Sequence, residues 1–153
     1  MRIIDVLNRD FVIADLKSNE KQGVLEEMVS DIASKINGID REMLLDVLLE
    51  REKLGSTGIG YGVAIPHGKM KGINHIIVTF GKSTKGVDFQ SLDGKPSHIF
   101  FLIIAPEDST ASHLKVLARI SRLLKESVFR DKLMSASLRD DIYKIIVDEY
   151  RKV

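Results

Sequence analysis

The 153-residue sequence contains no cysteine. This absence excludes disulfide frameworks, thiolate zinc sites, iron–sulfur clusters and a cysteine nucleophile in this chain. It also suits a reducing compartment, and we expect a cytoplasmic protein. Any covalent chemistry must therefore use another side chain.

An excess of charge of either sign is also missing. The 23 Lys and Arg residues nearly balance the 22 Asp and Glu residues, so the formal net charge is +1. Proteins that bind nucleic acid without sequence preference usually show a clear basic excess. We therefore expect no nucleic-acid partner.

Long hydrophobic runs are the third absence. The longest stretches without a charge, 54–68 and 96–106, are not apolar segments of the roughly 20 residues that a membrane helix needs. At the N-terminus, Asp5, Arg9 and Asp10 interrupt any apolar run before it reaches signal-peptide length. We expect neither a signal peptide nor membrane insertion.

Length and composition instead predict one globular domain over residues 1–153, with 44% hydrophobic and 29% charged residues. A domain of this size buries roughly 68 to 70% of its unfolded surface, which is enough for a real core. Strand-like and helix-like segments alternate, which predicts an α/β fold: a mixed parallel and antiparallel central sheet with helices on both faces. The predicted strands are 11–13, 63–65, 76–80 and 99–104.

Helices are predicted from apolar periodicity and capping residues. The first runs from near Asn19 to Ile36 with Ser18 as cap, and the second follows the cap Asp40 and ends at Gly55. The inward stripe of the second helix is predicted to comprise Met43, Leu44, Val47, Leu48 and Leu54. The third begins around 109–112 and ends near 126, with Leu114, Leu117, Ile120 and Leu124 on one face. A short helix near 128–134 and a terminal helix capped by Ser137 complete the prediction.

Glycine is concentrated in one segment. Residues 55–62 hold four of the eleven glycines and lead into the segment 63–68, Val-Ala-Ile-Pro-His-Gly. Glycines allow positive φ and close approach of the backbone, and successive exposed N–H groups can form a concavity for an anion. A plain flexible loop is the alternative interpretation.

Two phosphate-loop patterns fail when tested against this sequence. Gly58, Gly60 and Gly62 lack the dinucleotide-binding spacing and precede a predicted strand, where that fingerprint must open a helix. The segment 81–83, Gly-Lys-Ser, lacks the required glycine five positions earlier, where Ile76 stands. The sequence therefore supports neither an ATP nor an NAD site.

The four histidines can be ranked by predicted topology. Only nine residues, 67–75, separate the strand that ends near Pro66 from the strand that begins at 76, too few for a parallel crossover. These strands are therefore antiparallel if they pair, which places His67 and His75 at one end of the sheet. If the next connection also reverses, His98 lies at the other end and His113 returns to the first. This reasoning pairs His67 with His113.

Both His113 and Arg51 interrupt an apolar helix face. His113 lies in the first turn of the third helix, where the helix dipole favours a neutral ring, although a satisfied core histidine is the more common case. Arg51 stands on the inward stripe of the second helix. Its side chain either reaches solvent along that helix or points past the helix end to an anion beside the glycine segment.

Acidic residues are scarce around these positions. Between residues 51 and 85 there is one acidic residue, Glu52, and there are six basic ones: Arg51, Lys53, Lys69, Lys71, Lys82 and Lys85. Carboxylates would repel a phosphate, so this window of charge +5 favours an anion site.

The motifs together resemble a known family. Arg51-Glu52, the glycine segment and the Pro-His-Gly motif at 66–68 closely resemble the enzyme IIA domains of the fructose–mannitol class of the bacterial phosphoenolpyruvate-dependent sugar phosphotransferase system. The resemblance extends over nearly the whole chain, including residues 93–96 and the helix that starts with His113.

This resemblance implies a phosphoryl carrier. His67 would accept a phosphoryl group from phosphorylated HPr and pass it to a cysteine of an enzyme IIB partner, which works with a membrane component IIC. His113 and Arg51 match the family's other active-site residues. Physical reasoning adds Ser56, Thr57 and the Gly58 amide as donors to the phosphoryl oxygens. We expect no cofactor and no metal.

Two functions share these motifs. One is a phosphoryl carrier for sugar uptake. The other is a regulatory protein resembling the nitrogen-related IIA proteins, which would bind target proteins according to the phosphorylation state of His67. A histidine-based hydrolase is disfavoured, because there is no Gly-x-Ser-x-Gly motif and no evident acidic partner for His67. The sequence does not identify the sugar.

Overall fold

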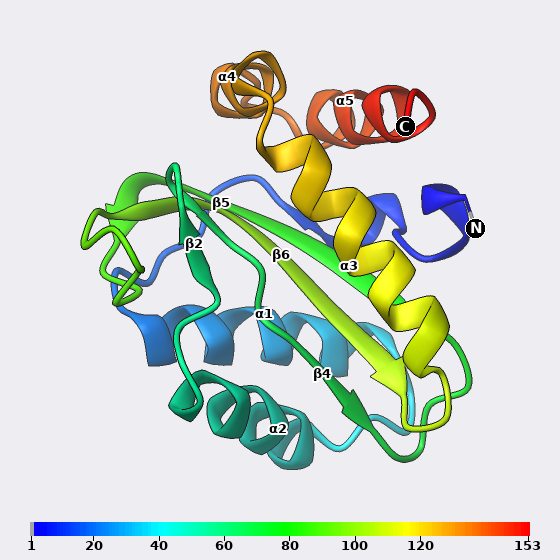
Figure 1. Ribbon diagram of the computed structural model, residues 1–153. Helices are drawn as coiled ribbons and strands as arrows, with labels where there is room; N and C mark the ends of the chain where they lie inside the picture. The colour runs from blue at the N-terminus through cyan, green and yellow to red at the C-terminus, as the bar shows by residue number, and fades with distance from the viewer. Residues whose placement is uncertain (1) are drawn as a thin grey trace.

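The structure is a computed structural model that describes residues 2–153. Its strands form one six-stranded mixed sheet, and helices cover both faces of that sheet (Figure 1). The strands are β1 (Val12–Ile13), β2 (Gly58–Gly60), β3 (Val63–Ala64), β4 (His67–Met70), β5 (Ile77–Val87) and β6 (Ser97–Pro106). The α-helices are α1 (Lys21–Lys35), α2 (Arg41–Lys53), α3 (Thr110–Leu124), α4 (Ser127–Ser135) and α5 (Arg139–Tyr150). Two 3-10 helices, Ile3–Asp5 and Arg9–Phe11, precede β1. The predicted α/β class and the helices on both faces are confirmed.

Strand β6 is the centre of the sheet. The strand order is β1-β5-β6-β3-β2, and β4 also pairs with β6. β5 pairs with β6 in antiparallel fashion, whereas β3 and β4 both pair with it in parallel, one after the other along the same edge. β3 and β5 therefore run in opposite directions, as predicted, but β6 lies between them and they do not pair.

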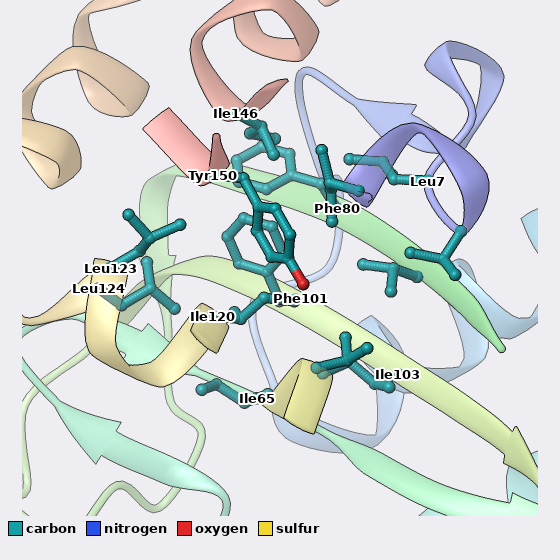
Figure 2. Packing of buried hydrophobic residues seen from close by; sticks show 14 of the residues in the cluster. Leu7, Ile65, Phe80, Phe101, Ile103, Ile120, Leu123, Leu124, Ile146 and Tyr150 are labelled. Carbon is teal, nitrogen blue, oxygen red and sulfur yellow. The ribbon is translucent and has the colours of Figure 1, made fainter. Parts of the chain in front are cut away.

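The alternation of side chains along β6 divides the core into two clusters. Phe101 and Ile103 face the layer of α3, α4 and α5, whereas Phe100 and Leu102 face α1 and α2. Figure 2 shows Ile120, Ile146 and Tyr150 from the first helical layer packed over Phe80 and Phe101. A strand that is apolar on both faces in this way is typical of the middle of an α/β sheet.

The helix boundaries correct two of the predicted caps. The Asp40 side chain accepts a hydrogen bond from the Met43 amide at 3.0 Å, as predicted. Ser18 does not cap α1, which begins at Lys21 after Glu20, and Ser137 does not cap α5, which follows Leu138. Propensity for a cap does not determine where the chain enters a helix, because packing shifts the boundary by one or two residues.

Two leucines and one methionine that were predicted to lie on inward helix faces are exposed, so these predictions are wrong. Leu54 is 84% exposed, Leu114 is 57% exposed and Met43 is 43% exposed. The apolar stripe of a helix is only about 100° wide, and residues at its margin face the solvent or a cleft rather than the core. Leu114 and Leu117 instead face the cleft described below.

The strands extend beyond the predicted ones. β5 continues through the polar residues after Phe80 as far as Val87, and β2 and β4 were not predicted. The glycine segment is therefore not a plain loop, because it contains β2 and the turn from β2 to β3. In that turn Gly60, Tyr61 and Gly62 all have positive φ (97°, 59° and 74°).

Candidate functional site

Position 67 is set by the break between β3 and β4. Between Ala64 and His67 the Pro66 carbonyl oxygen still accepts from the Ile103 amide at 2.9 Å, and β4 begins at His67, which is opposite Ile103. The next residue, Gly68, lies so close to α2 that a Cβ there would approach Val47 Cγ1 to 2.5 Å. A glycine is therefore needed for β4 to pack on α2, and this packing places His67 beside the end of that helix.

The backbone selects the tautomer of His67. Its Nδ1 lies 2.7 Å from the Ile65 carbonyl oxygen. A carbonyl oxygen can only accept, so Nδ1 carries the proton and Nε2 keeps its lone pair. Burial lowers the pKa of His67 below 6.5 and the nearby Arg51 charge lowers it further, whereas the bond to Ile65 opposes this shift. The ring is therefore neutral at pH 7, and Nε2 has a free lone pair.

His113 lies next to His67. The two ring centroids are 5.6 Å apart and the rings are inclined at 43°. His113 is 5% exposed, and its Nδ1 has no hydrogen-bond partner among the described residues. Its pKa is lowered mainly by burial, then by His67 and Lys69. The His113 ring is therefore kept neutral chiefly by burial and not by the helix dipole. Its buried Nδ1 could form a hydrogen bond with a ligand oxygen.

Arg51 points past the end of α2 toward the glycine segment. Its guanidinium donates to the Gly55 carbonyl oxygen at 2.9 Å. The side chain is half-buried, and it lines the same cleft as His67. Arg51 therefore supplies a positive charge beside the nucleophile and has further N–H donors that could bind an anion.

The structure adds a residue that sequence reasoning overlooked. Glu52 is buried, forms an ion pair with Lys21 at 2.9 Å, and accepts hydrogen bonds from both the amide and the hydroxyl of Thr57. This carboxylate ties α1, α2 and the start of β2 together. The sequence offered one indication of this role: Glu52 is the one acidic residue among six basic ones, and a carboxylate that is buried needs a partner.

The three predicted phosphate donors of the glycine segment are already engaged. The Ser56 hydroxyl donates to the Phe89 carbonyl oxygen at 3.1 Å and accepts from the Gly58 amide at 3.0 Å. Both donors of Thr57 are bonded to Glu52. Phosphate binding by Ser56, Thr57 or Gly58 stays a prediction, and it requires these groups to exchange partners.

A cleft of about 470 Å³ brings the site together. Its polar lining includes Arg51 and His67, and its apolar lining includes Leu92, Leu114 and Leu117. Leu92 is 75% exposed, so leucines at the rim face solvent. Exposed apolar side chains around a reactive group are typical of a surface that contacts another protein.

Only some of the basic residues between 51 and 85 lie near His67 and His113. Lys69 donates to the Thr110 hydroxyl at 3.0 Å, near His113. Lys82 is instead buried under α4, where its amine donates to backbone carbonyls that include Met134 and Ala136, and burial lowers its pKa. Folding thus removes Lys82 from the predicted charge cluster.

The remaining histidines lie outside the cleft. His75 is exposed and bonded to the Asn74 side chain at 2.7 Å, and His98 Nδ1 contacts the Ser83 carbonyl oxygen at 2.9 Å. Within residues 2–153 there is no group of three or more His, Asp or Glu side chains arranged to hold a metal. No helix in this part of the chain has the length and hydrophobicity to cross a membrane.

The comparisons with known proteins point to one family. The family model described as "Phosphoenolpyruvate-dependent sugar phosphotransferase system, EIIA 2" matches residues 5–149. A nitrogen regulatory protein of Bradyrhizobium diazoefficiens is 40% identical over 146 residues, 95% of each chain. The fructose-specific EIIABC component of Bacillus subtilis is also 40% identical, over 95% of this chain but only 23% of its own length.

A solved structure supports the same assignment. The nitrogen regulatory protein IIA-Ntr of Neisseria meningitidis matches with a TM-score of 0.88 and 30% identity, over 94% of this chain and 98% of that one. With a family model over nearly the whole chain and relatives at 40% identity, the chain belongs to the EIIA type 2 family of the phosphoenolpyruvate-dependent sugar phosphotransferase system.

Proposed function

We propose that this protein is a phosphoryl carrier in which Nε2 of His67 takes up and releases the phosphoryl group. In the first step, the bond between phosphorus and HPr breaks while a bond between phosphorus and Nε2 of His67 forms. In the second, that N–P bond breaks as a cysteine thiolate of an enzyme IIB partner attacks phosphorus. The observation that carries this proposal is the Nδ1 bond to Ile65, which leaves Nε2 unprotonated in a cleft.

The neighbouring side chains suit a phosphoryl group. Transfer through a loose, in-line transition state requires mainly positioning and donors to the equatorial oxygens. Arg51 has guanidinium N–H groups beside Gly55, and His113 has a buried ring nitrogen without a partner. These two groups are the donors we assign to the phosphoryl oxygens. Burial of the His67 ring and the positive charge of Arg51 lower the pKa of His67, so its ring stays neutral.

The rim of the cleft suits protein partners. The exposed leucines Leu92 and Leu114 flank the approach to His67, so a donor or acceptor protein can bury them when it brings its own reactive group to Nε2. The Bacillus subtilis relative is named as an EIIABC component. That name supports enzyme IIB as the acceptor class, with a membrane IIC beyond it.

A second function rests on the same phosphorylated histidine. The Bradyrhizobium relative is named a nitrogen regulatory protein, and it matches this chain over 95% of both lengths. In this alternative the protein binds target proteins according to whether His67 carries phosphate. The two functions share the first transfer and differ in the second.

The first transfer is tested by labelling with radioactive phosphoenolpyruvate, enzyme I and HPr. We expect one phosphate per chain in the wild type and none in His67→Ala, because the nucleophile is lost. His75→Ala is the matched control, since His75 is exposed and bonded only to Asn74, and it should label normally. Labelling of the His67 variant would refute the assignment.

The second transfer separates carrier from regulator. The phosphorylated protein is mixed with a IIB domain encoded near its gene, and with a variant of that domain whose cysteine is replaced by serine. Loss of label from His67 within seconds, only with the cysteine present, supports the carrier. Retention of label, together with phosphorylation-dependent capture of a purified candidate target, supports the regulator.

A further inference from the structure

Two adjoining hollows lie on the face of the molecule where both chain ends meet α3. Figure 1 shows the N-terminal segment and the C-terminal end of α5 beside α3. One hollow, of about 450 Å³, is lined by residues from the N-terminal segment, α3 and α5. The other, of about 330 Å³, lies between α3 and Tyr150. They share Arg119 and Tyr150, and we call them together the basic groove.

The charged side chains that line the groove are all positive. They are Arg2, Lys115, Arg119, Arg122 and Arg151, and no Asp or Glu of residues 2–153 lines either hollow. Helix α3 itself, residues 110–124, contains no acidic residue. The whole protein has a net charge of only +1, so this concentration of cations is local.

One of these cations is held in a fixed position. The Arg119 guanidinium donates to the carbonyl oxygens of Tyr150 at 3.1 Å and Val153 at 2.8 Å. It also lies over the Tyr150 ring, 4.1 Å from the centroid. Because Arg119 belongs to both hollows, a charge of fixed orientation stands at their common wall.

Three cations other than Arg119 have no counter-ion within residues 2–153. Among the interactions described for residues 2–153, the side chains of Lys115, Arg122 and Arg151 take part in no hydrogen bond or ion pair. Arg2, by contrast, is paired with Asp5 at 3.3 Å. Lys115, Arg119 and Arg122 are spaced by four and three residues, so they share one face of α3, where like charges repel and destabilise a helix.

We propose that the basic groove binds a small molecule that carries two or more negative charges, as phosphate or carboxylate groups. Such a ligand relieves the repulsion along α3 and offers the acceptor oxygens that guanidinium and ammonium groups bind best. The volumes of the hollows match ligand pockets, which usually measure about 300 to 1,000 Å³. Arg51 and His67 line the neighbouring cleft, which shares Ala118 with the groove. The cations of the groove do not line that cleft, so they are not among the groups proposed for phosphoryl transfer.

The test uses the intact protein with two probes, pyrophosphate for phosphate and citrate for carboxylate. Binding is measured by calorimetry and mapped by backbone amide shifts in two-dimensional NMR, with either probe added from about 10 μM to about 10 mM. We expect at least one probe to shift most strongly the amides of Lys115, Arg119 and Arg122 and of residues 147–151. The amide of His67 should shift less than the amides of the groove.

Two double variants distinguish binding at the groove from a general effect of the protein's positive charge. Lys115→Gln with Arg122→Gln removes two groove cations, and we expect about tenfold weaker binding. Lys71→Gln with Lys85→Gln removes the same charge from two exposed lysines outside the groove, and it should bind as the wild type does. Both pairs are surface changes, and circular dichroism confirms that each is folded.

Several outcomes overturn the proposal. These are no binding of either probe at about 10 mM, equal weakening in both variant pairs, or shifts centred on Arg51 and His67. Binding of an acidic protein or a nucleic acid at the groove, with no response to either probe, also overturns it. Because no phosphoryl transfer is measured, failure here is independent of failure of His67 as acceptor.

Discussion

The cleft at His67 and the basic groove are neighbours along α3, where Ala118 lines both, but their polar groups differ in how they are bonded. In the cleft, Nδ1 of His67, the guanidinium of Arg51 and the hydroxyl of Thr57 are all bonded within the protein. In the groove, the side chains of Lys115 and Arg122 form no hydrogen bond or ion pair with the rest of residues 2–153. Fixed groups suit a reaction whose geometry must be prepared in advance, whereas unpartnered cations suit recognition of a charged ligand.

The largest effect that distinguishes the two regions should come from the donors beside His67. Removing one prepared donor typically slows a reaction by about 10² to 10³, so we expect Arg51→Ala and His113→Ala to accept phosphate from phosphorylated HPr at rates reduced by that factor. Rapid-quench labelling measures these rates. Lys115→Gln, in the groove, should react at the wild-type rate, and a comparable slowing in that variant would erase the distinction.

The next effect concerns the buried charge that supports the cleft. Replacing Glu52 by Ala leaves the Lys21 amine, which is 16% exposed, without its partner. We expect a loss of about 3 kcal/mol in the free energy of unfolding, the lower end of the range for breaking a buried ion pair. Urea denaturation measures this loss. Arg122→Ala is the control from the groove, and it should change stability by less than about 0.5 kcal/mol.

The exposed leucines should affect partner binding without affecting stability. We expect Leu92→Ser with Leu114→Ser to raise the KM for phosphorylated HPr about tenfold, because apolar surface buried in the complex is lost. The free energy of unfolding should stay within about 0.5 kcal/mol of the wild type. Leu138→Ser is the control, since Leu138 is also exposed but lies outside the cleft. An unchanged KM would contradict docking at this rim.

The smallest effect is a pH dependence carried by His67 and its neighbour His113. Burial lowers the pKa values of His67 and His113 below 6.5, so just below that pH the folded state binds fewer protons than the unfolded state. The free energy of unfolding should therefore decrease as pH falls from about 7.5 to about 5.5.

The slope of that dependence should become shallower in His67→Gln with His113→Gln and remain in His75→Gln. Urea titrations at several pH values measure it. Stability that increased on acidification would show that these rings are protonated in the folded protein, contrary to the neutral tautomer assigned to His67.

Residues with strong local signals were located from sequence alone. Asp40 caps α2 because its preference acts within three residues, and the apolar run ending at Ile104 predicts a central strand because both of its faces must be covered. The proximity of His67 and His113 followed from strand directions. The pairing of β3 with β6 rather than β5 could not be predicted, because strand order depends on distant segments that no local pattern specifies.

The same limit explains the misplaced side chains. Leu54 and Leu114 fit the apolar periodicity of their helices, yet they are exposed. Periodicity shows which residues share a helix face, but it does not show whether that face packs on the core or lies in solvent. The role of Glu52 depends on Lys21, thirty-one positions earlier, and a spacing of that length carries no signal. The basic groove combines both chain ends with α3, so its residues look like ordinary solvated positions in the sequence.

By itself, then, the sequence determined the α/β class, the absence of thiol chemistry and the motif that identifies His67, since these depend on composition and short-range pattern. Only the tertiary structure decided that Nε2 is the free nitrogen of His67, that His113 is its neighbour and that Arg2 and Arg151 line the same groove as the cations of α3. Burial and hydrogen bonding between distant segments control tautomer, pKa and charge pairing, and those contacts exist only once the chain has folded.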